Sequence, residues 1–296
     1  MYKGFQLATW CSFILFNAVY HLDHHHAQQP FFKKSEMNRS NSSNLFSRIY
    51  LFSIVVFLYL PILVMILMSF NTSKFYQLPI DWTFDWYVEL AGNKKLLKAG
   101  WNSLFVAIVS TIISSVLGTC VAYAFFRFDF KGKRFLQILL LPPITIPWLI
   151  IGTSMLIFFF WVGIGRGLFP MILGHVALSI PYVVIVVGAR MKTFDIALEE
   201  SARSLGASPL QAFFKVTLPW IFPGFFAASL FAFAVSLDQF VISYFLATPG
   251  ERTLPVEIYT AIRKGFTPEI NAISTIIILL SMSILLVVSR FHRFSR

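Results

Sequence analysis

Residues 200–219 of this 296-residue chain have the sequence ESARSLGASPLQAFFKVTLP, in which one glycine and two prolines punctuate short apolar runs. Just upstream, Asp195 is a suitable N-cap for a short helix, and Gly206 is a natural helix stop. Ser208 can cap a second helix whose first residue is proline, with Gln211 completing a capping box. The pattern therefore predicts a helix, a glycine turn and a second helix that ends at a proline.

The first of these two helices is predicted to be amphipathic. One face carries three apolar residues at helical spacing: Leu198, Ala202 and Leu205. Glu199 and Glu200 stand four and three residues before Arg203, so we expect them to pair with it on the exposed side. From these residues alone, the helix pair could be a docking element or an interfacial hairpin that only joins two membrane spans.

The composition of the whole chain indicates a membrane protein. Hydrophobic residues make up 57% of it and charged residues only 12%, about half the charged share of a soluble domain. A span of roughly 30 Å of hydrocarbon takes about 20 helical residues. The stretches that meet this length are Tyr50–Phe70, Ser103–Phe125, Phe135–Val162, Leu168–Ala189, Trp220–Leu246 and Ile270–Ser289. We therefore expect an all-α integral membrane protein with six transmembrane helices.

Prolines and basic residues add detail to this topology. Kinks are expected where prolines interrupt the third and fourth spans, at Pro142, Pro143, Pro147 and Pro181. The formal net charge of +11 would suggest nucleic acid in a soluble protein, but here the basic residues lie between apolar runs. One side of the membrane would hold 16 of the 24 Lys and Arg residues. That side is predicted to be cytoplasmic, with both termini inside and no nucleic-acid partner.

The expected organisation has four parts: a poorly ordered cytoplasmic segment at 1–48, a six-helix domain at 49–290, the cytoplasmic loop at 191–220 within it, and a tail at 291–296. Met37 precedes a polar, basic segment that leads into the first span, so either residues 1–36 are native or Met37 is the natural start. The cluster at His21–His26 could bind metal or belong to an unstructured tail. Two cysteines without ligand spacing predict no metal site elsewhere.

The spacing within residues 200–219 resembles the EAA loop of ABC importer permeases, whose pattern is Glu-Ala-Ala, three residues, Gly, nine residues, Ile, one residue and Leu-Pro. Ser201 and Val216 are the two departures, where the family has Ala and Ile. The resemblance implies the type I ABC importer permease (MetI-like) fold, in which cytoplasmic coupling helices dock into a cleft of the ATPase. The docking residues expected here are Glu200, Ala202, Arg203, Leu205, Gly206, Leu218 and Pro219.

The same resemblance implies partners and a cellular location. No Walker A pattern occurs in the chain, so ATP is expected to be used by a separate ATPase subunit, with no catalytic residue and no directly bound cofactor here. The implied assembly holds two ATPase subunits, a second permease subunit and a periplasmic binding protein, in the bacterial inner membrane. A homodimer and a heterodimer of permeases both remain open. ATP binding would draw two coupling loops together and alternate access to the path.

Further stretches are similar to those of spermidine/putrescine permeases: Ser69–Asn71, Trp86–Tyr87, Ser236–Phe240, Leu254–Tyr259 and Pro268–Ala272. An acidic residue within an apolar span, such as Asp238, should face a cavity or a partner. A carboxylate with aromatic faces suits a polyamine. The residues expected along the substrate path are Asp238, Ser236, Trp86 and Trp148. Asp238 could equally bond to a neighbouring helix or the partner permease, and His175 is expected to serve packing.

One departure keeps the substrate open. Trp148 follows Pro147 where the polyamine permeases carry an acidic residue, so another cation or organic solute is an alternative. A secondary transporter would explain six spans and an intramembrane Asp, but not the spacing of the loop. A membrane enzyme would need a nucleophile or a metal cluster near the spans, and the chain holds no HExxH pattern.

Overall fold

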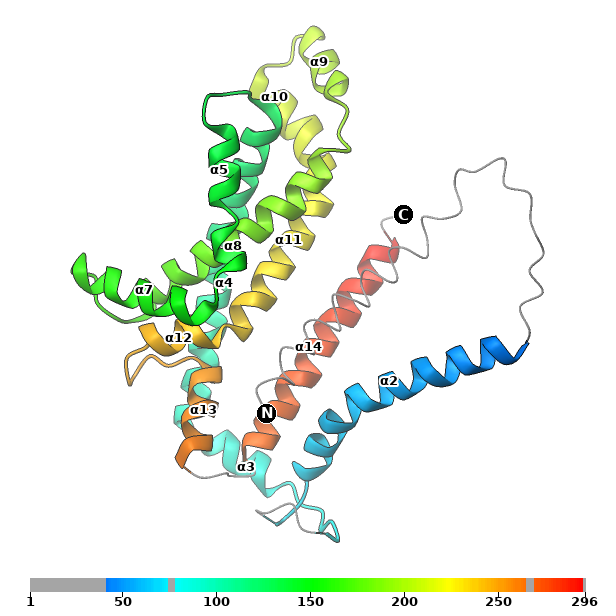
Figure 1. Cartoon of the computed structure of the whole chain (residues 1–296), viewed down its shortest axis with the longest axis vertical. Helices are drawn as coiled ribbons and strands as arrows, with labels where there is room; N and C mark the ends of the chain where they lie inside the picture. Colours follow the sequence, from blue (N-terminus) through cyan, green and yellow to red (C-terminus); the bar gives the residue numbers. More distant parts are fainter. Residues whose placement is uncertain (1–40, 74–77, 265–268, 295–296) are drawn as a thin grey trace. The chain divides into compact units, whose positions relative to one another are not determined.

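The computed structural model describes residues 41–73, 78–264 and 269–294, which are nearly all helical and contain no strand. The chain divides into two compact units (Figure 1). Unit 1 joins the residues up to Asn93 to those from Ala261 onward, and unit 2 is Lys94–Thr260. The His21–His26 cluster, Met37 and the last two residues of the predicted tail lie outside the described residues.

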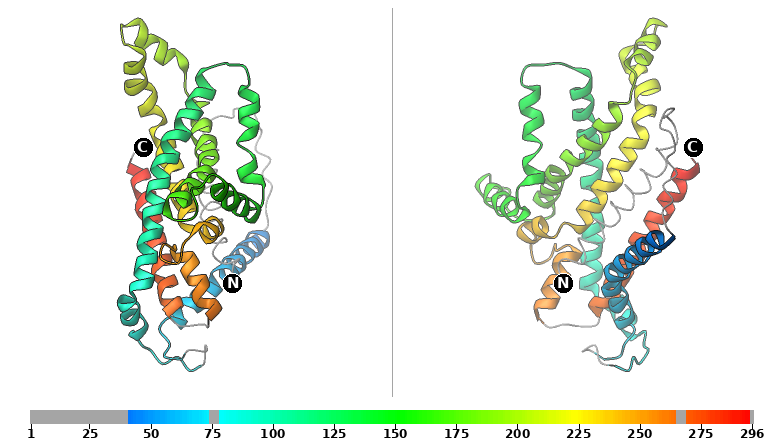
Figure 2. Two further views of the ribbon diagram at one scale, coloured as in Figure 1. Left: turned by 90° about the vertical axis from the view of Figure 1, so that its left-hand side faces the viewer. Right: turned by 45° about the vertical axis from the view of Figure 1, so that its right-hand side comes forward.

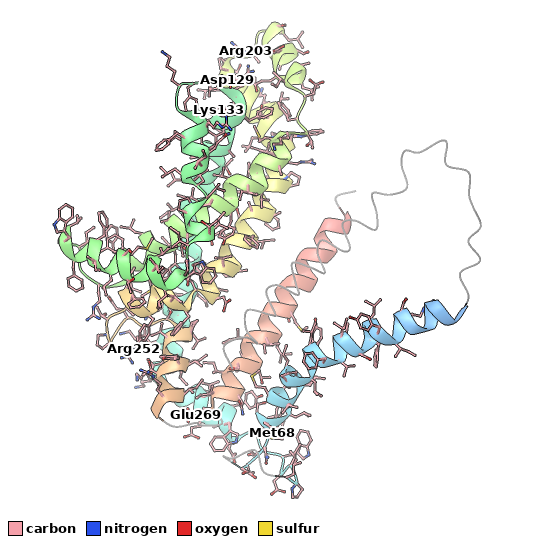
Figure 3. All side chains as sticks on the ribbon, in the orientation of Figure 1. Met68, Asp129, Lys133, Arg203, Arg252 and Glu269 are labelled. Atoms are coloured by element: carbon pink, nitrogen blue, oxygen red, sulfur yellow. The ribbon has the colours of Figure 1, made fainter. Side chains whose placement is uncertain are left out.

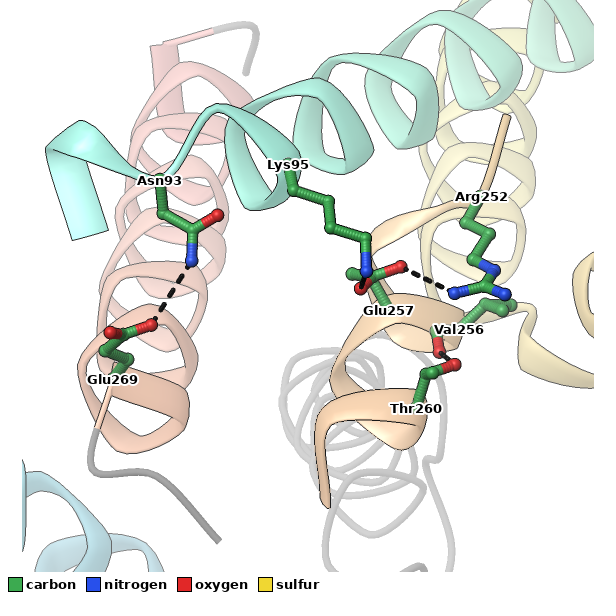
Figure 4. A network of polar contacts seen from close by, with 7 residues as sticks. All are labelled: Asn93, Lys95, Arg252, Val256, Glu257, Thr260 and Glu269. Atoms are coloured by element: carbon green, nitrogen blue, oxygen red, sulfur yellow. Dashed lines mark hydrogen bonds and ion pairs between the residues drawn. The ribbon is translucent and has the colours of Figure 1, made fainter. Parts of the chain in front are cut away.

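The described part of unit 1 holds three helices: α2 (Asn41–Met68), α3 (Asp85–Gly92) and α14 (Glu269–Phe294). Both α2 and α3 pack against α14. The Nδ2 of Asn93 donates to Oε2 of Glu269 at 3.3 Å, which ties the end of α3 to the start of α14 (Figure 4). Between α2 and α3, the indole Nε1 of Trp86 donates to the Asn71 carbonyl at 2.8 Å.

Three long helices form the centre of unit 2: α4 (Lys94–Arg127), α8 (Leu168–Met191) and α11 (Leu218–Asp238). Each packs against the other two (Figures 1 and 2). Small residues allow this close approach, because a Cβ added to Gly118 on α4 would lie 2.7 Å from Val183 Cβ on α8. Close packing at small residues is the usual way in which helices associate in a bilayer.

Two of the predicted spans are broken rather than continuous. The third consists of α5 (Lys133–Leu139), α6 (Pro142–Thr145) and α7 (Trp148–Trp161), and its two arms are bent by 108°. The chain therefore bends sharply where kinks were expected. Pro142, Pro143 and Pro147 each lack a backbone N–H donor, which interrupts the helical hydrogen bonds at the bend. The fifth predicted span ends as α11 at Asp238, and the chain continues as α12 (Phe240–Leu246).

Four helical segments of the described chain are long and apolar enough to cross a membrane: Ser47–Met68, Lys94–Arg127, Leu168–Met191 and Pro209–Asp238. The bent pair from Lys133 to Trp161 makes a fifth if it counts as one span. In α14 the side chains are described without a gap only as far as Leu279, which leaves a shorter apolar helix. The all-helical membrane fold is confirmed, whereas the number of six spans stays a prediction.

Unit 2 carries different polar groups at its two ends (Figure 3). One end holds α9 (Ile196–Ser204), α10 (Pro209–Ala212) and the π-helical segment η1 (Phe213–Thr217). The other end holds α13 (Leu254–Lys264) as far as Thr260, and there the buried carboxylate of Glu257 binds Lys95 at 2.6 Å and Arg252 at 3.3 Å (Figure 4). The pair with Lys95 fastens α13 to the start of α4, and the pair with Arg252 fastens the segment just before α13 to that helix.

Candidate functional site

The loop between α8 and α11 has the local structure that its sequence predicts. Asp195 caps α9 by accepting from the backbone N–H of Ala197 at 3.0 Å. Gly206 ends the turn with a φ of +95°, a backbone conformation that glycine adopts without strain. Ser208 and Gln211 exchange the two hydrogen bonds of a capping box, at 3.0 and 3.3 Å. We call residues 191–220 the coupling loop from here on.

Several large apolar side chains of the coupling loop face outward. Leu205 is 90% exposed and Leu210 is 71% exposed. Phe214 and Leu198 are exposed as well. The predicted apolar face of α9 therefore does not pack on its own protein, and such exposed apolar groups are typical of an interaction surface.

The inner side of α9 is held by a carboxylate. Glu199 is only 4% exposed, accepts from the Thr217 hydroxyl at 3.1 Å and pairs with the Arg127 guanidinium at 3.7 Å. The predicted pairing of Glu199 with Arg203 on the exposed side is wrong. A buried carboxylate needs compensating partners, and the end of α4 and the π-helical segment supply them. We call Glu199, Thr217 and Arg127 the clasp.

The base of the coupling loop is closed by Arg190 and Trp220. The Nε of Arg190 donates to the Trp220 carbonyl at 3.3 Å, and its guanidinium carbon lies 5.0 Å from the centroid of the Trp220 ring. The ring of Phe194 lies between those of Trp220 and Phe126, tilted toward the first and edge-on to the second, with centroids 6.2 and 6.4 Å away. The loop is therefore tied to the long helices at its base as well as at the clasp.

The second candidate region is the break between α11 and α12. Gln239 is extended there, with φ −72° and ψ 93°, and its side chain is almost fully buried. Neither polar atom of its amide has a hydrogen-bond partner among the described residues. The preceding Asp238 is partly buried at the last position of α11, and within the described chain no hydrogen bond or ion pair reaches its carboxylate.

A buried polar chain lies beside this break. The Nδ1 of His175 is 2.7 Å from the Ser236 hydroxyl, and its Nε2 is 3.0 Å from the Ser243 hydroxyl. Ser236 also contacts the hydroxyl of Ser110 at 2.9 Å. The expected packing role of His175 fits its burial, but the ring is also fully hydrogen-bonded. The hydroxyl of Ser236 is engaged inside unit 2, so its expected place on the substrate path stays a prediction.

Aromatic rings gather just after the break. The rings of Phe240, Tyr244 and Tyr259 lie 4.9 to 5.7 Å apart, centroid to centroid. Tyr244 is 41% exposed, whereas the other two are partly buried. A carboxylate followed directly by clustered aromatic faces is chemistry that suits an organic cation.

Comparison with known proteins identifies the kind of chain that carries these two regions. Residues 114–295 match the family model described as the binding-protein-dependent transport system inner membrane component. The chain belongs to this family. It is therefore the permease subunit of an ATP-driven importer rather than an enzyme, and ATP is used by a separate subunit.

Two relatives from Escherichia coli resemble the permease over most of their length. The spermidine/putrescine transport system permease protein PotC is 35% identical over 78% of this chain and 87% of its own. The putrescine transport system permease protein PotI is 37% identical over 75% of this chain and 82% of its own. The resemblance expected from the sequence is thus confirmed.

Solved structures support the fold of the permease. A chain of a bacterial ABC transporter involved in the import of the acidic polysaccharide alginate aligns with a TM-score of 0.63 at 17% identity, over 90% of this chain and 99% of that one. A chain of the MetNI methionine ABC transporter, in an inward-facing conformation, aligns with a TM-score of 0.56 at 21% identity, over 68% of this chain and 96% of that one. The expected type I permease fold is confirmed.

The predicted site residues of the permease lie in three places: the coupling loop, unit 2 and unit 1. The expected docking residues lie on the coupling loop, where Ala202 and Leu218 are partly buried and the others are exposed: Glu200, Arg203, Leu205, Gly206 and Pro219. Asp238 and Ser236 share the last turns of α11, and Trp148 begins α7 in the same unit. Trp86 belongs to the other unit, where its indole is bonded to the Asn71 carbonyl.

Sequence reasoning missed the groups that hold both regions in place. The members of the clasp stand far apart in the chain, so no local spacing links Arg127 to Glu199. The contacts of His175 were equally hidden, because Ser236 and Ser243 follow it by 61 and 68 residues in the chain. The sequence does show a polar residue inside an apolar span, as at His175. Such a residue indicates that a polar partner exists, but it does not say which residue that partner is.

Proposed function

We propose that this permease carries polyamines, spermidine or putrescine, across the bacterial inner membrane. The single observation that carries the proposal is the carboxylate of Asp238, which stands at a break in an apolar span with no partner in the described chain. An unpaired carboxylate is expensive in an apolar span, so it is expected to face a cavity or a charged partner. The names of the two bacterial relatives give independent support.

The chemistry of the break fits a polyamine in two ways. The Asp238 carboxylate would pair with one ammonium group as the substrate passes. The aromatic faces of Phe240, Tyr244 and Tyr259 would hold a second cationic group or the alkyl chain between them. Trp148 would add a further aromatic face along the path, in place of an acidic residue after Pro147.

Coupling to ATP would run through the loop. The exposed Leu205, with Glu200 and Arg203 beside it, would enter a cleft of the ATPase subunit. Because the clasp and the Arg190–Trp220 contact tie the loop to α4, α8 and α11, movement of the ATPase would be passed to the long helices. Such transmission needs a stiff lever rather than a flexible linker.

Orientation and assembly complete the proposal. The end of unit 2 that carries the coupling loop would be cytoplasmic, because the positive-inside rule assigns the more basic side to the cytoplasm. Two ATPase subunits, a second permease and a periplasmic binding protein would form the importer. The substrate would be delivered on the side of α13, opposite the coupling loop.

The test is uptake of labelled spermidine and putrescine by the assembled importer in liposomes, with ATP hydrolysis measured in parallel. We expect wild type to import at least one polyamine, and Asp238→Asn to lower the number of molecules imported per ATP about tenfold, which corresponds to one lost charge-assisted contact. Asp238→Glu keeps the charge and should retain most of the import.

Asp129→Asn is the matched control, because Asp129 is exposed in the loop after α4. There the hydrogen bond from Lys133 lowers the pKa of Asp129. This variant should import like wild type. If an intact assembly imports neither polyamine, the substrate assignment is wrong. If Asp238→Asn imports normally, the substrate stands and the role of Asp238 is rejected.

A further inference from the structure

His175 connects the two sides of the helix break at Gln239. Its Nδ1 contacts Ser236, three residues before the break, at 2.7 Å, and its Nε2 contacts Ser243, four residues after it, at 3.0 Å. The histidine itself comes from a third helix, α8, which packs against both α11 and α12. One buried ring thus connects α11 and α12 at the point where the helical backbone hydrogen bonds between them are interrupted.

The polar chain can be satisfied without any charge. With the proton on Nδ1, the ring donates to Ser236 and accepts at Nε2 from Ser243. Ser236 then donates to Ser110, which in turn donates to the Ala107 carbonyl at 3.3 Å. Every hydroxyl in this arrangement has one acceptor, so a neutral imidazole is enough. Neutral and fully bonded groups are what an apolar membrane interior tolerates best.

A glycine brings the third helix close enough for this contact. A Cβ added to Gly174, the residue before His175, would lie 2.7 Å from the Cγ2 of Ile242. That distance is shorter than real contacts of this kind, so a larger residue here would require Ile242 on α12 to shift away from α8. Because Ser243 follows Ile242, the same shift would lengthen its contact with His175.

We propose that His175 is a positioning residue that staples α11 to α12 and thereby fixes the place of Asp238 on the substrate path. Asp238 stands between the two stapled serines and is the residue directly before the break. Because α11 ends at Asp238, the regular helical hydrogen bonds do not continue on its C-terminal side and cannot hold this residue in place. The inference rests on the proposed role of Asp238, but the staple itself is a property of the fold that can be tested without substrate.

The experiment compares variants of His175 in the assembled importer, measuring polyamine imported per ATP hydrolysed. His175→Leu should lower this ratio about tenfold, because two buried hydroxyls lose their partner and Asp238 is displaced. His175→Asn can replace the Nδ1 contact with Ser236, and His175→Gln the Nε2 contact with Ser243. Both should give intermediate ratios. A merely structural lesion would reduce import and ATP hydrolysis together and leave the ratio unchanged.

Double-mutant cycles give the sharpest test of the staple. Ser243→Ala should lower the melting temperature and the transport ratio in wild type, but should add nothing in His175→Leu. Gly174→Ala should act like Ser243→Ala although it removes no polar group. Ser114→Ala is the matched control, because among the described residues this buried hydroxyl on α4 bonds only to the Thr111 carbonyl of its own helix.

Two outcomes would overturn the staple. One is an additive cycle, in which Ser243→Ala has the same effect with and without His175. The other is a normal transport ratio in a folded His175→Leu importer. The first outcome does not depend on the substrate assignment, because the melting temperatures of the cycle can be measured even if wild type imports no polyamine. Absence of polyamine import would reject the proposed function and leave the cycle to decide the staple.

Discussion

The coupling loop and the break at Gln239 each depend on one buried side chain that ties together segments from different helices. In the loop, the carboxylate of Glu199 accepts from the Thr217 hydroxyl and forms an ion pair with Arg127 at the end of α4. At the break, His175 bonds two neutral hydroxyls between packed apolar helices. The contact in the loop is an ion pair, whereas the contacts at the break are hydrogen bonds between neutral groups.

The difference follows from the surroundings of each region. The loop leaves the long helices and exposes charged and apolar groups, so Arg127 keeps some contact with solvent while it pairs. In the apolar interior of a membrane a full charge is costly, whereas a hydrogen-bonded neutral group is tolerated. We therefore expect loop variants to uncouple the ATPase, and break variants to spoil substrate passage while ATP hydrolysis continues.

The largest loss of transport is expected for a substitution at Gly206. An added Cβ would meet no atom of the described residues within 4 Å, so Gly206→Trp should leave the permease folded. The bulky ring would project from the docking side of the loop and should abolish both transport and copurification of the ATPase. Gly206→Ala is the control, because it carries the same backbone strain at φ +95° without the bulk, at roughly 1 kcal/mol. Full uptake by the Trp variant would mean that the loop is not the coupling element.

A strong but smaller effect is expected at the clasp. Glu199→Ala leaves the Arg127 guanidinium and the Thr217 hydroxyl without their buried partner, which should destabilise the loop by about 1–3 kcal/mol. Transport and stimulated ATP hydrolysis should then fall together. The neighbouring Glu200→Ala removes an equal charge from an exposed position, so it should leave the melting temperature of the permease unchanged. Equal thermal shifts in the two variants would contradict the clasp.

Local structure was predictable from the sequence where the signal itself is local. The caps at Asp195 and Ser208 and the glycine turn at Gly206 follow from neighbouring residues, and the structure contains all three. The long apolar runs likewise predicted the helices that could span a bilayer. The prolines predicted that the third span is interrupted. They did not predict the angle of 108° between its two helical arms.

Tertiary contacts were not predictable in the same way. No proline or glycine stands next to Gln239, so an apolar run concealed the end of α11. The amphipathic pattern of α9 was recognised, but Glu199 was expected on the exposed side. It lies on the inner side instead, because its carboxylate pairs with Arg127 on a helix far away in the chain. The apolar face remains outside, with Leu205 90% exposed. A helix that docks onto a partner need not turn its apolar side to its own core.

The smallest effects should distinguish the two kinds of tie most cleanly, because each variant removes a single hydroxyl. Thr217→Val deletes a hydrogen bond to a carboxylate, worth about 1.5–3 kcal/mol. Ser110→Ala deletes one between neutral hydroxyls, worth about 0.5–1.5 kcal/mol, and a long bond of 3.3 Å to the Ala107 carbonyl of its own helix. The melting temperature should therefore fall further in the first variant. Ser236 also keeps His175 when Ser110 is lost, so the transport ratio of that variant should stay close to wild type. A larger thermal shift for Ser110→Ala would show that the neutral chain, and not the charged clasp, is the stronger tie.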